Sequence, residues 1–242
     1  MGGVPYIDNY SWYTNSNLNA GKERSSVEFI LNELKENLET AVLHLEEKKN
    51  NSLGDENDFL FMSKDVARII LADVCMYLND YVRAQSLLES VVNNGFYSLD
   101  ASNYSNKETV DNLINGNRTE SIFILNCRYP AGNRSKVIPV MTYTDVILSY
   151  AECLYKTGDS QKSREYLDQI VAAKDISVSG DILKSIKDIR MEIMLYGVTN
   201  FAFLKRNNMA QAVYDIEAYK LLLPIPAKEI NTNPKITQNP GY

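Results

Sequence analysis

Two stretches of this chain repeat one pattern, in which two amphipathic helices are joined by a linker of only two residues. The linker is Asn79-Asp80 in residues 63–94 and Gly158-Asp159 in residues 143–172. Apolar residues recur at three- and four-residue spacing on both sides of each linker, which is typical of helices with one buried face. Because so short a linker holds its helices antiparallel, each helix must cover the apolar face of the other. The sequence therefore predicts two helical hairpins.

Small residues stand where the two helices of each hairpin would cross most closely. They are Ala72 and Ala84 in the first hairpin, and Ala151 and Ser163 in the second. Small side chains allow two helix axes to approach, and the pattern resembles the tetratricopeptide repeat. The hairpins are separated by more than the ~34-residue period of a tandem array. We therefore expect tetratricopeptide-like helical pairs interrupted by an irregular insert, residues 96–142.

The rest of the chain adds further helices and little sheet. The insert contains one predicted strand, ESIFILNCRY, which is apolar on both faces. Residues 25–49 predict an amphipathic helix that begins with a capping box of Ser25 and Glu28. Residues 181–196 predict another helix, which Gly197 would end. The fold class is therefore all-α, and residues 1–242 are expected to form a single domain.

The carboxy-terminal tail, residues 220–242, carries four of the seven prolines of the chain. Each proline removes a backbone donor and fixes its own φ, so the tail can form neither a long helix nor a strand. It nevertheless contains a leucine run, three isoleucines and a final tyrosine. We therefore expect an extended tail whose apolar side chains pack on the helices.

Composition excludes several classes of function. The formal net charge is -6 and there is no block of Lys or Arg, which argues against binding to nucleic acid. No apolar run is long enough to span a bilayer, and the first residues lack the features of a signal peptide. No glycine-rich phosphate loop is present, and no cofactor is predicted. Three cysteines, Cys75, Cys127 and Cys153, form no CxxC pair and are interpreted as free thiols, two of them buried.

Catalytic and metal-binding constellations are also lacking. His44 is the only histidine, so neither a three-ligand histidine site nor a Ser- or Cys-based triad with a histidine base is predicted. Two pairs of carboxylates, Asp145 with Glu152 and Asp188 with Glu192, lie on predicted helices. Solvated or salt-bridged helix faces explain them better than an acid/base pair. We predict no catalytic or metal-binding residue and no enzymatic activity.

One short segment near the amino terminus, YIDNYSWYT, indicates ligand binding. It places Tyr10, Trp12 and Tyr13, with Tyr6 close by, in a polar stretch that includes the only tryptophan. Aromatic faces beside Asn and Asp side chains can stack on sugar rings or hold peptides. The alternative is that these rings pack the first segment onto the helices. Tyr10, Trp12 and Tyr13 are our candidate ligand-binding residues.

Several segments, taken in order, resemble the SusD/RagB family of nutrient-binding lipoproteins from the outer membranes of Bacteroidetes. The most specific is KLLLPIPAKEINTNPKITQNPGY at the carboxy terminus. The others are GGVPYI, RSSVEFILNELKENLETAVLHL, the ARIILADVCMYLNDYVRAQSLLESVVNNGFYSL block, TESIFIL, IPVMTYTDVILSYAECLYKTGD, DIRMEIMLYG and FLKR. The resemblance implies tetratricopeptide-like pairs with the tail laid over them. It also implies capture of a glycan or peptide beside a TonB-dependent, SusC-like transporter. The protein would then lie at the outer membrane, either exposed at the cell surface or on the periplasmic side.

The sequence departs from the family in ways that leave a second interpretation open. Typical members are longer and begin with a lipoprotein signal and its cysteine, so the lipid anchor of the family has no counterpart here. CRYPAGNRSKV is too short to replace the ligand-binding insertion of relatives, and the usual Arg-Tyr-Ala-Asp reads Thr142 to Asp145. The alternative is a reduced tetratricopeptide-like module that binds a protein partner without ligand capture. A glycoside hydrolase ranks third.

Overall fold

The structure of the protein is a computed structural model that describes residues 2–7, 21–47, 62–101, 120–128, 135–178, 180–193 and 199–242. The chain divides into two compact units. Unit 1 comprises Met1–Leu34 and Leu204–Tyr242, and unit 2 comprises Lys35–Phe203. Both ends of the chain therefore belong to the same unit, while the predicted helical hairpins belong to the other.

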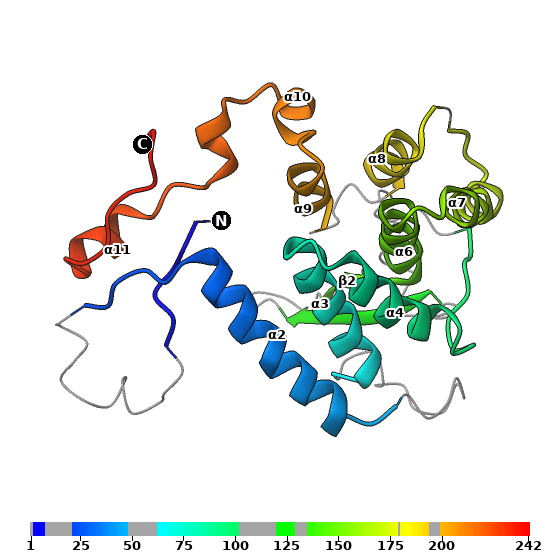
Figure 1. The fold of residues 1–242 in the computed structure, drawn as a ribbon, viewed down its shortest axis with the longest axis horizontal. Coiled ribbons are helices and arrows are strands. Elements are labelled where there is room, and N and C mark those ends of the chain that lie inside the picture. Colours follow the sequence, from blue (N-terminus) through cyan, green and yellow to red (C-terminus); the bar gives the residue numbers. More distant parts are fainter. Residues whose placement is uncertain are drawn as a thin grey trace. The chain divides into compact units, whose positions relative to one another are not determined.

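The first predicted hairpin is confirmed as helices α3 (Lys64–Tyr77) and α4 (Tyr81–Val92) (Figure 1). The Ser63 hydroxyl accepts the Val66 amide at the start of α3. Between the helices, Asn79 adopts a left-handed φ of 61°. Asp80 then accepts the Arg83 amide at 3.2 Å and so caps α4. The two-residue linker thus ends one helix and begins the next.

The second hairpin follows the same plan, with α6 (Tyr143–Thr157) and α7 (Ser160–Lys174). Gly158 ends α6 with a φ of 101°, and Asp159 caps α7 by accepting the Lys162 amide at 3.0 Å. The Ser163 hydroxyl donates to the Ala151 carbonyl across the hairpin at 2.7 Å. All four small residues at the predicted crossings are fully buried, as expected.

The hairpins pack directly on one another inside unit 2. Helix α4 contacts α6, and α8 (Ile182–Ile193) packs against both α6 and α7. Helix α8 contributes an isoleucine stripe in which Ile186, Ile189 and Ile193 are fully buried. Burial of one such side chain is worth about 1.5–3 kcal/mol. Asp181 caps this helix by accepting the Lys184 amide at 2.8 Å, whereas the predicted stop at Gly197 lies outside the described residues.

The insert contains two strands where the sequence predicted one. Strand β1 (Ser121–Arg128) is the predicted strand, and β2 (Ser135–Thr142) pairs with it antiparallel. Strand β2 escaped prediction because it contains Pro139, which cannot donate to a ladder and is paired with Ile124 beside a register irregularity. Ile122 and Ile124 are buried but Leu125 is exposed. The second apolar face is covered only in part, since Phe123 is half-buried.

Helix α2 (Val27–His44) is shorter than the predicted 25–49, and its cap differs. The Ser26 hydroxyl, and not that of Ser25, accepts an amide of the first turn, that of Phe29 at 3.1 Å. The predicted capping box is therefore wrong by one residue. No residue of α2 is buried, and His44 at its end is exposed, as predicted.

Four short helical elements near the carboxy terminus were not predicted as helices. They are α9 (Thr199–Arg206), α10 (Ala210–Tyr214), the 3-10 helix η3 (Ala218–Leu221) and α11 (Ala227–Thr232). Segments of four to eight residues are too short to show a helical period. Together with the hairpins they confirm a mostly helical fold with little sheet. None of the helices within the described ranges is long and apolar enough to cross a membrane.

Candidate functional site

The predicted ligand-binding residues Tyr10, Trp12 and Tyr13 lie in residues 8–20, outside the described residues. The structure does describe both flanks of this segment, residues 2–7 and 21–26. In the first flank, Tyr6 is half-buried and its ring meets the Phe29 ring edge-on, with centroids 5.6 Å apart. Tyr6 therefore packs on helix α2, which is the alternative that the sequence left open for this aromatic residue.

The two flanks are fastened to each other at the base of the segment. The Ser25 amide donates to the Val4 carbonyl at 2.9 Å, and Arg24 Nε donates to the Gly3 carbonyl at 2.6 Å. A Cβ on Gly3 would collide with the Ser25 carbonyl oxygen, so only glycine permits this approach. The GGVP motif thus has a physical role, because it lets the first residues lie against the chain that leads into α2.

Arg24 also contacts the carboxy-terminal tail. Its Nη2 donates to Asn239 Oδ1 at 2.6 Å and its Nη1 donates to the Thr237 carbonyl at 3.1 Å. Asn239 is buried. A guanidinium group presents several donors in a fixed plane, so one side chain can hold separate acceptors. A second contact lies nearby, where Asn233 Nδ2 donates to the Lys22 carbonyl at 2.8 Å.

The tail is organised by amide side chains that pair with its own backbone. Gln238 Oε1 accepts the Ile225 amide at 2.7 Å, and Gln238 Nε2 donates to the Ile225 carbonyl at 3.0 Å. Asn239 Nδ2 donates to the Leu223 carbonyl at 2.6 Å. Pro224, Pro226 and Pro240 have no amide proton to form a hydrogen-bonded ladder. The side chains of Gln238 and Asn239 supply the missing donors and acceptors. This explains why a proline-rich LLLPIP segment accompanies TQNPGY.

The last residue completes this arrangement. The Tyr242 hydroxyl donates to the Leu222 carbonyl at 2.9 Å, and its ring meets the Tyr219 ring edge-on at 5.2 Å. Gly241, with a φ of 95°, passes so close to Tyr219 that a Cβ would enter the ring. The final tyrosine is therefore held at both its ring and its hydroxyl.

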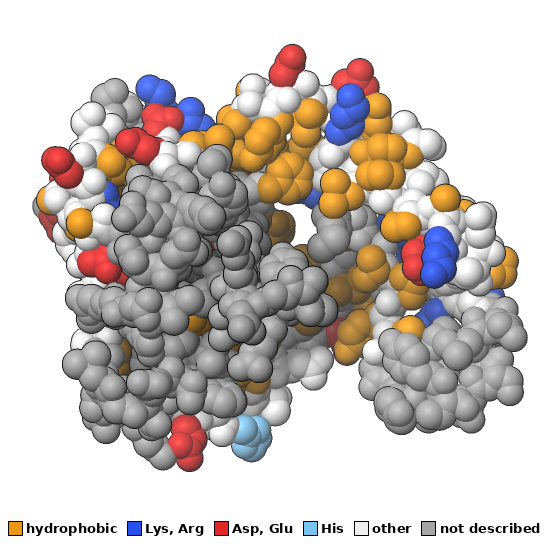
Figure 2. Space-filling model, turned by 180° about the vertical axis from the view of Figure 1, so that it is seen from behind, with side chains coloured by type: hydrophobic (Ala, Val, Ile, Leu, Met, Phe, Trp, Pro, Cys, Tyr) orange, Lys and Arg blue, Asp and Glu red, His pale blue; other side chains and the backbone are white. Residues whose placement is uncertain are grey.

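The apolar side chains of the tail are covered to different degrees. Ile236 is buried, Leu223 and Tyr242 are exposed, and four others are half-buried: Leu221, Leu222, Ile225 and Ile230. Figure 2 shows hydrophobic side chains gathered on one face over α10, η3 and the following tail. Three large exposed hydrophobic residues belong to these elements: Tyr214, Leu223 and Tyr242. The tail is therefore packed in part through its apolar side chains, and polar contacts to backbone also hold it.

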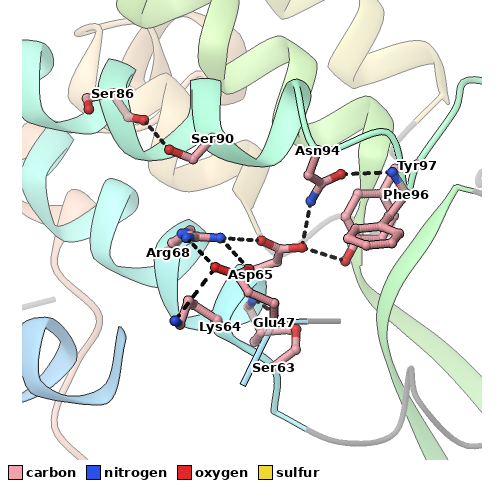
Figure 3. Close-up of polar contacts among 11 residues, drawn as sticks. Glu47, Ser63, Lys64, Asp65, Arg68, Ser86, Ser90, Asn94, Phe96 and Tyr97 are labelled. Atoms are coloured by element: carbon pink, nitrogen blue, oxygen red, sulfur yellow. Dashed lines mark hydrogen bonds and ion pairs between the residues drawn. The ribbon is translucent and has the colours of Figure 1, made fainter. Parts of the chain in front are cut away.

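Unit 2 contains buried polar clusters, of which one surrounds Asp65 in the first turn of α3 (Figure 3). The carboxylate accepts Arg68 Nη1 at 3.0 Å, Asn94 Nδ2 at 2.8 Å and the Tyr97 hydroxyl at 3.2 Å. Burial raises the pKa of Asp65, although the hydrogen bonds from Arg68 and Tyr97 oppose that shift. The cluster ties the start of α3 to the residues that follow α4.

Arg68 extends this cluster toward the end of the α2 segment. Its two terminal nitrogens each donate to Glu47 at 2.8 Å, and the Lys64 amide donates to the Glu46 carbonyl at 3.1 Å. The hydrogen bond from Arg68 lowers the pKa of Glu47. Because Arg68 bonds both Asp65 and Glu47, its guanidinium links the start of α3 to the chain that follows α2. The arrangement stabilises a chain junction and offers no reactive group.

A second cluster surrounds Glu120 at the start of β1. Lys174 Nζ donates to Glu120 Oε2 at 2.6 Å, the Asp100 amide donates to the same oxygen at 3.2 Å, and the Thr144 hydroxyl donates to Oε1. The Glu120 side chain is fully buried, and burial raises its pKa to about 8. Both carboxylate oxygens are occupied by protein donors, so the group joins β1, α6 and α7.

The carboxylates considered for catalysis are also held within the structure. Asp145 is buried and forms an ion pair with Arg190, and the Thr199 hydroxyl donates to it at 3.0 Å. Asp188 forms an ion pair with Lys187 at 2.9 Å. The salt-bridged interpretation is confirmed for these two residues. Glu152 is fully buried, so a solvated position is wrong for it.

The described residues show no group of His, Cys, Asp and Glu that could hold a metal ion. Cys75 and Cys153 are buried free thiols, which confirms that interpretation for both. The side chain of Cys127 lies outside the described part of the chain. In the described residues, the polar contacts considered above fall into two groups. One joins residues 2–7 to residues 21–26 and to the tail, and the other consists of the buried clusters around Asp65 and Glu120 in unit 2.

The sequence model of the SusD family, SusD_RagB, matches residues 180–242. A SusD superfamily protein from Bacteroides vulgatus superimposes with a TM-score of 0.79 at 17% identity, covering 100% of this chain and 74% of that one. No curated protein sequence matches the chain.

Two of the similar structures are described by their glycan ligands. Surface glycan-binding protein A from Bacteroides thetaiotaomicron, in complex with laminarihexaose, has a TM-score of 0.74 at 16% identity and covers 99% of this chain and 74% of that one. A laminarin binding SusD-like protein has a TM-score of 0.75 at 17% identity with the same coverages. These matches show the SusD fold, and with the family signature at the carboxy terminus they confirm the predicted resemblance.

Proposed function

Because this chain carries the SusD signature on a SusD fold, we propose that it is a non-enzymatic nutrient-binding protein. Its ligand would be a glycan or a peptide, captured for uptake at the outer membrane. The observation that carries the proposal is the structural likeness, over 99% of this chain, to a protein bound to laminarihexaose. That likeness favours a glycan, and a β-glucan oligosaccharide is the first ligand to test.

We place ligand capture on Tyr10, Trp12 and Tyr13. Support comes from the flanks of their segment, where Arg24, Val4 and Ser25 fix the two ends close together. A segment with both ends fixed loses less conformational entropy when it binds than a segment with free ends. Aromatic side chains on such a segment suit stacking against sugar rings.

The partners and the location follow from the family resemblance. In this proposal the chain works beside a TonB-dependent, SusC-like transporter at the cell surface or in the periplasm, and a lipid anchor provides the only attachment to the membrane. The whole chain, residues 1–242, acts as one SusD-like domain. Binding depends on shape and stacking, and no covalent step is involved.

Calorimetric titration with laminarihexaose tests this function directly. We expect saturable binding that Trp12→Ala weakens by about five-fold or more, because a stacked ring is worth on the order of 1 kcal/mol or more. Tyr214→Ala is the matched control, since this exposed tyrosine of unit 1 lies in α10. It should leave the affinity unchanged.

Two results would contradict the proposal. Absence of binding to a panel of glucans, other glycans and peptides, together with stable co-purification of a protein partner, would favour the reduced interaction module. Turnover of a chromogenic glycoside by the purified chain would make it an enzyme.

A further inference from the structure

The two ends of this chain are joined at one side chain, that of Arg24. Its guanidinium donates to the Gly3 carbonyl, the Thr237 carbonyl and Asn239 Oδ1, at 2.6, 3.1 and 2.6 Å. These acceptors lie 21, 213 and 215 residues away in the sequence. We propose that the last five residues, Gln238–Tyr242, act as a terminal strap that, through Arg24, helps to keep the two flanks, residues 2–7 and 21–26, bonded to each other.

Arg24 suits this role because its donors lie in one plane and point in different directions. Nε faces the amino-terminal flank, while Nη1 and Nη2 face the tail. A lysine at this position would keep the positive charge but could not match three acceptors in that plane. Arg24→Lys therefore separates the loss of geometry from the loss of charge.

The terminal strap is bonded to the rest of the tail, so it can hold the Arg24 side chain in place. Gln238, Asn239 and Tyr242 each bond the backbone of residues 222–225, as described above. A terminus attached at only one point would fray, whereas this one is bonded along its length. The strap is therefore a rigid support for Arg24.

Close glycine contacts show that the strap has little freedom to shift. A Cβ on Gly2 would collide with both the Arg24 guanidinium and Asn239 Oδ1. A Cβ on Gly21, where φ is 65°, would collide with Asn233 Oδ1. Glycines thus occur on both flanks where the tail comes closest. The contact is specific in shape as well as in hydrogen bonding.

The order of the chain gives this arrangement a consequence. Residues 2–26 are made before residues 237–239, which supply two of the three acceptors of Arg24. The flanks can form their direct bonds early, but Arg24 gains its support from the tail only after the hairpins of unit 2 have all of their own residues. A chain that lacks these tail residues should fold its hairpins and hold the flanks less tightly.

Hydrogen exchange measured by mass spectrometry tests the strap without any ligand. We expect Arg24→Lys, and a chain that ends at Ile236, to speed exchange in peptides covering residues 2–7 and 21–26 by at least about ten-fold, because local opening would set the rate. The Ser25 amide reports directly, since it donates to Val4. Peptides from α6 should exchange as before, which shows that unit 2 remains folded.

Arg83→Lys is the matched control, because it makes the same change on an exposed arginine of unit 2. It should leave the flanks protected. Combining Arg24→Lys with Asn239→Ala should have a smaller effect than the sum of the two changes, since either one alone already removes the hydrogen bond between Arg24 and Asn239. Flanks that stay protected in Arg24→Lys and in the truncated chain would overturn the proposal, and so would effects of Arg24→Lys and Asn239→Ala that simply add.

Discussion

The two units of this molecule are stabilised in different ways. In unit 2, helices α3, α4, α6, α7 and α8 bury continuous apolar stripes, and side-chain caps begin the helices. In unit 1, few apolar side chains are buried, and Arg24, Asn233, Gln238 and Asn239 hold the chain through bonds to backbone. The comparison teaches that one chain can combine a periodic core with a region that depends on single polar contacts.

The largest effect should come from removing a core side chain of unit 2. Leu154, on α6, is fully buried, and Leu154→Ala should lower the free energy of unfolding by about 2–5 kcal/mol through lost burial and a cavity. The matched control is Leu223→Ala in the tail, where the side chain is 61% exposed. It should change stability by less than about 0.5 kcal/mol. Urea denaturation measures both, and equal losses would contradict this division between the units.

The pH dependence of unit 2 should reveal the buried Glu120. Burial raises its pKa from 4.5 to about 8 in the folded chain, so the folded state keeps a proton that the unfolded state releases. This contribution to stability is fully present below pH 4.5 and is lost as the pH rises toward 8. Between pH 5 and 8 we expect the free energy of unfolding to fall by on the order of 3 kcal/mol.

Glu120→Gln should flatten this fall, because glutamine does not titrate. Glu89→Gln is the control, since hydrogen bonds from Tyr150 and Lys162 lower the pKa of Glu89. The contribution of Glu89 is present above its ordinary pKa of 4.5 and is lost only in acid. Denaturation curves at several pH values measure both variants. A slope between pH 5 and 8 that survives Glu120→Gln would assign it to another group.

Two glycine substitutions, one in each unit, should separate the cost of a steric overlap from the cost of a strained backbone conformation. Gly95 and Gly241 both have positive φ, but a Cβ on Gly95 has no neighbour within 4 Å, whereas one on Gly241 meets the Tyr219 ring. Alanine at either position costs about 1–2 kcal/mol for its backbone conformation. Gly241→Ala should cost roughly 1–3 kcal/mol more because of the overlap. Hydrogen exchange in each unit measures the two changes, and equal effects would show that the Tyr219 contact is unimportant.

The smallest effect should come from one hydroxyl at the end of the chain. Tyr242→Phe removes the bond to the Leu222 carbonyl but keeps the ring contact with Tyr219. We expect a loss of about 1 kcal/mol in the local stability of the tail. Exchange of peptides covering residues 219–225 measures it, with α7 peptides as an internal reference. If exchange does not change, the ring contact with Tyr219 alone holds Tyr242 in place.

The same contrast between the units explains which parts of the fold could be predicted from the sequence. The hairpins were predictable because helical spacing, two-residue linkers and small crossing residues such as Ala72 and Ala151 are local signals. Strand β2 was not, since Pro139 argues against a strand. The role of Arg24 was invisible because its partners lie 213 and 215 residues away and form no repeating pattern. The family resemblance marked TQNPGY as a signature but could not indicate which contacts it makes.

The candidate site was predictable only in part. Tyr6 proved to be a packing residue, while Tyr10, Trp12 and Tyr13 lie outside the described residues and remain a prediction. The buried position of Glu152 was missed, since a carboxylate on a helix is more often at the surface. The available signals for the contacts between residues 2–7 and 21–26 were the Gly2-Gly3 pair and Arg24. Neither signal is specific alone.

The asparagines that hold the tail have one chemical consequence for the durability of the protein. Asn233 is followed by Pro234, and Asn239 by Pro240. Deamidation of asparagine usually begins when the next backbone nitrogen attacks the side-chain carbonyl and loses its proton. Proline nitrogen carries no such proton in a peptide. The two amides are therefore shielded from the commonest route of chemical ageing, and the contacts that join the tail to residues 22 and 24 should be correspondingly long-lived.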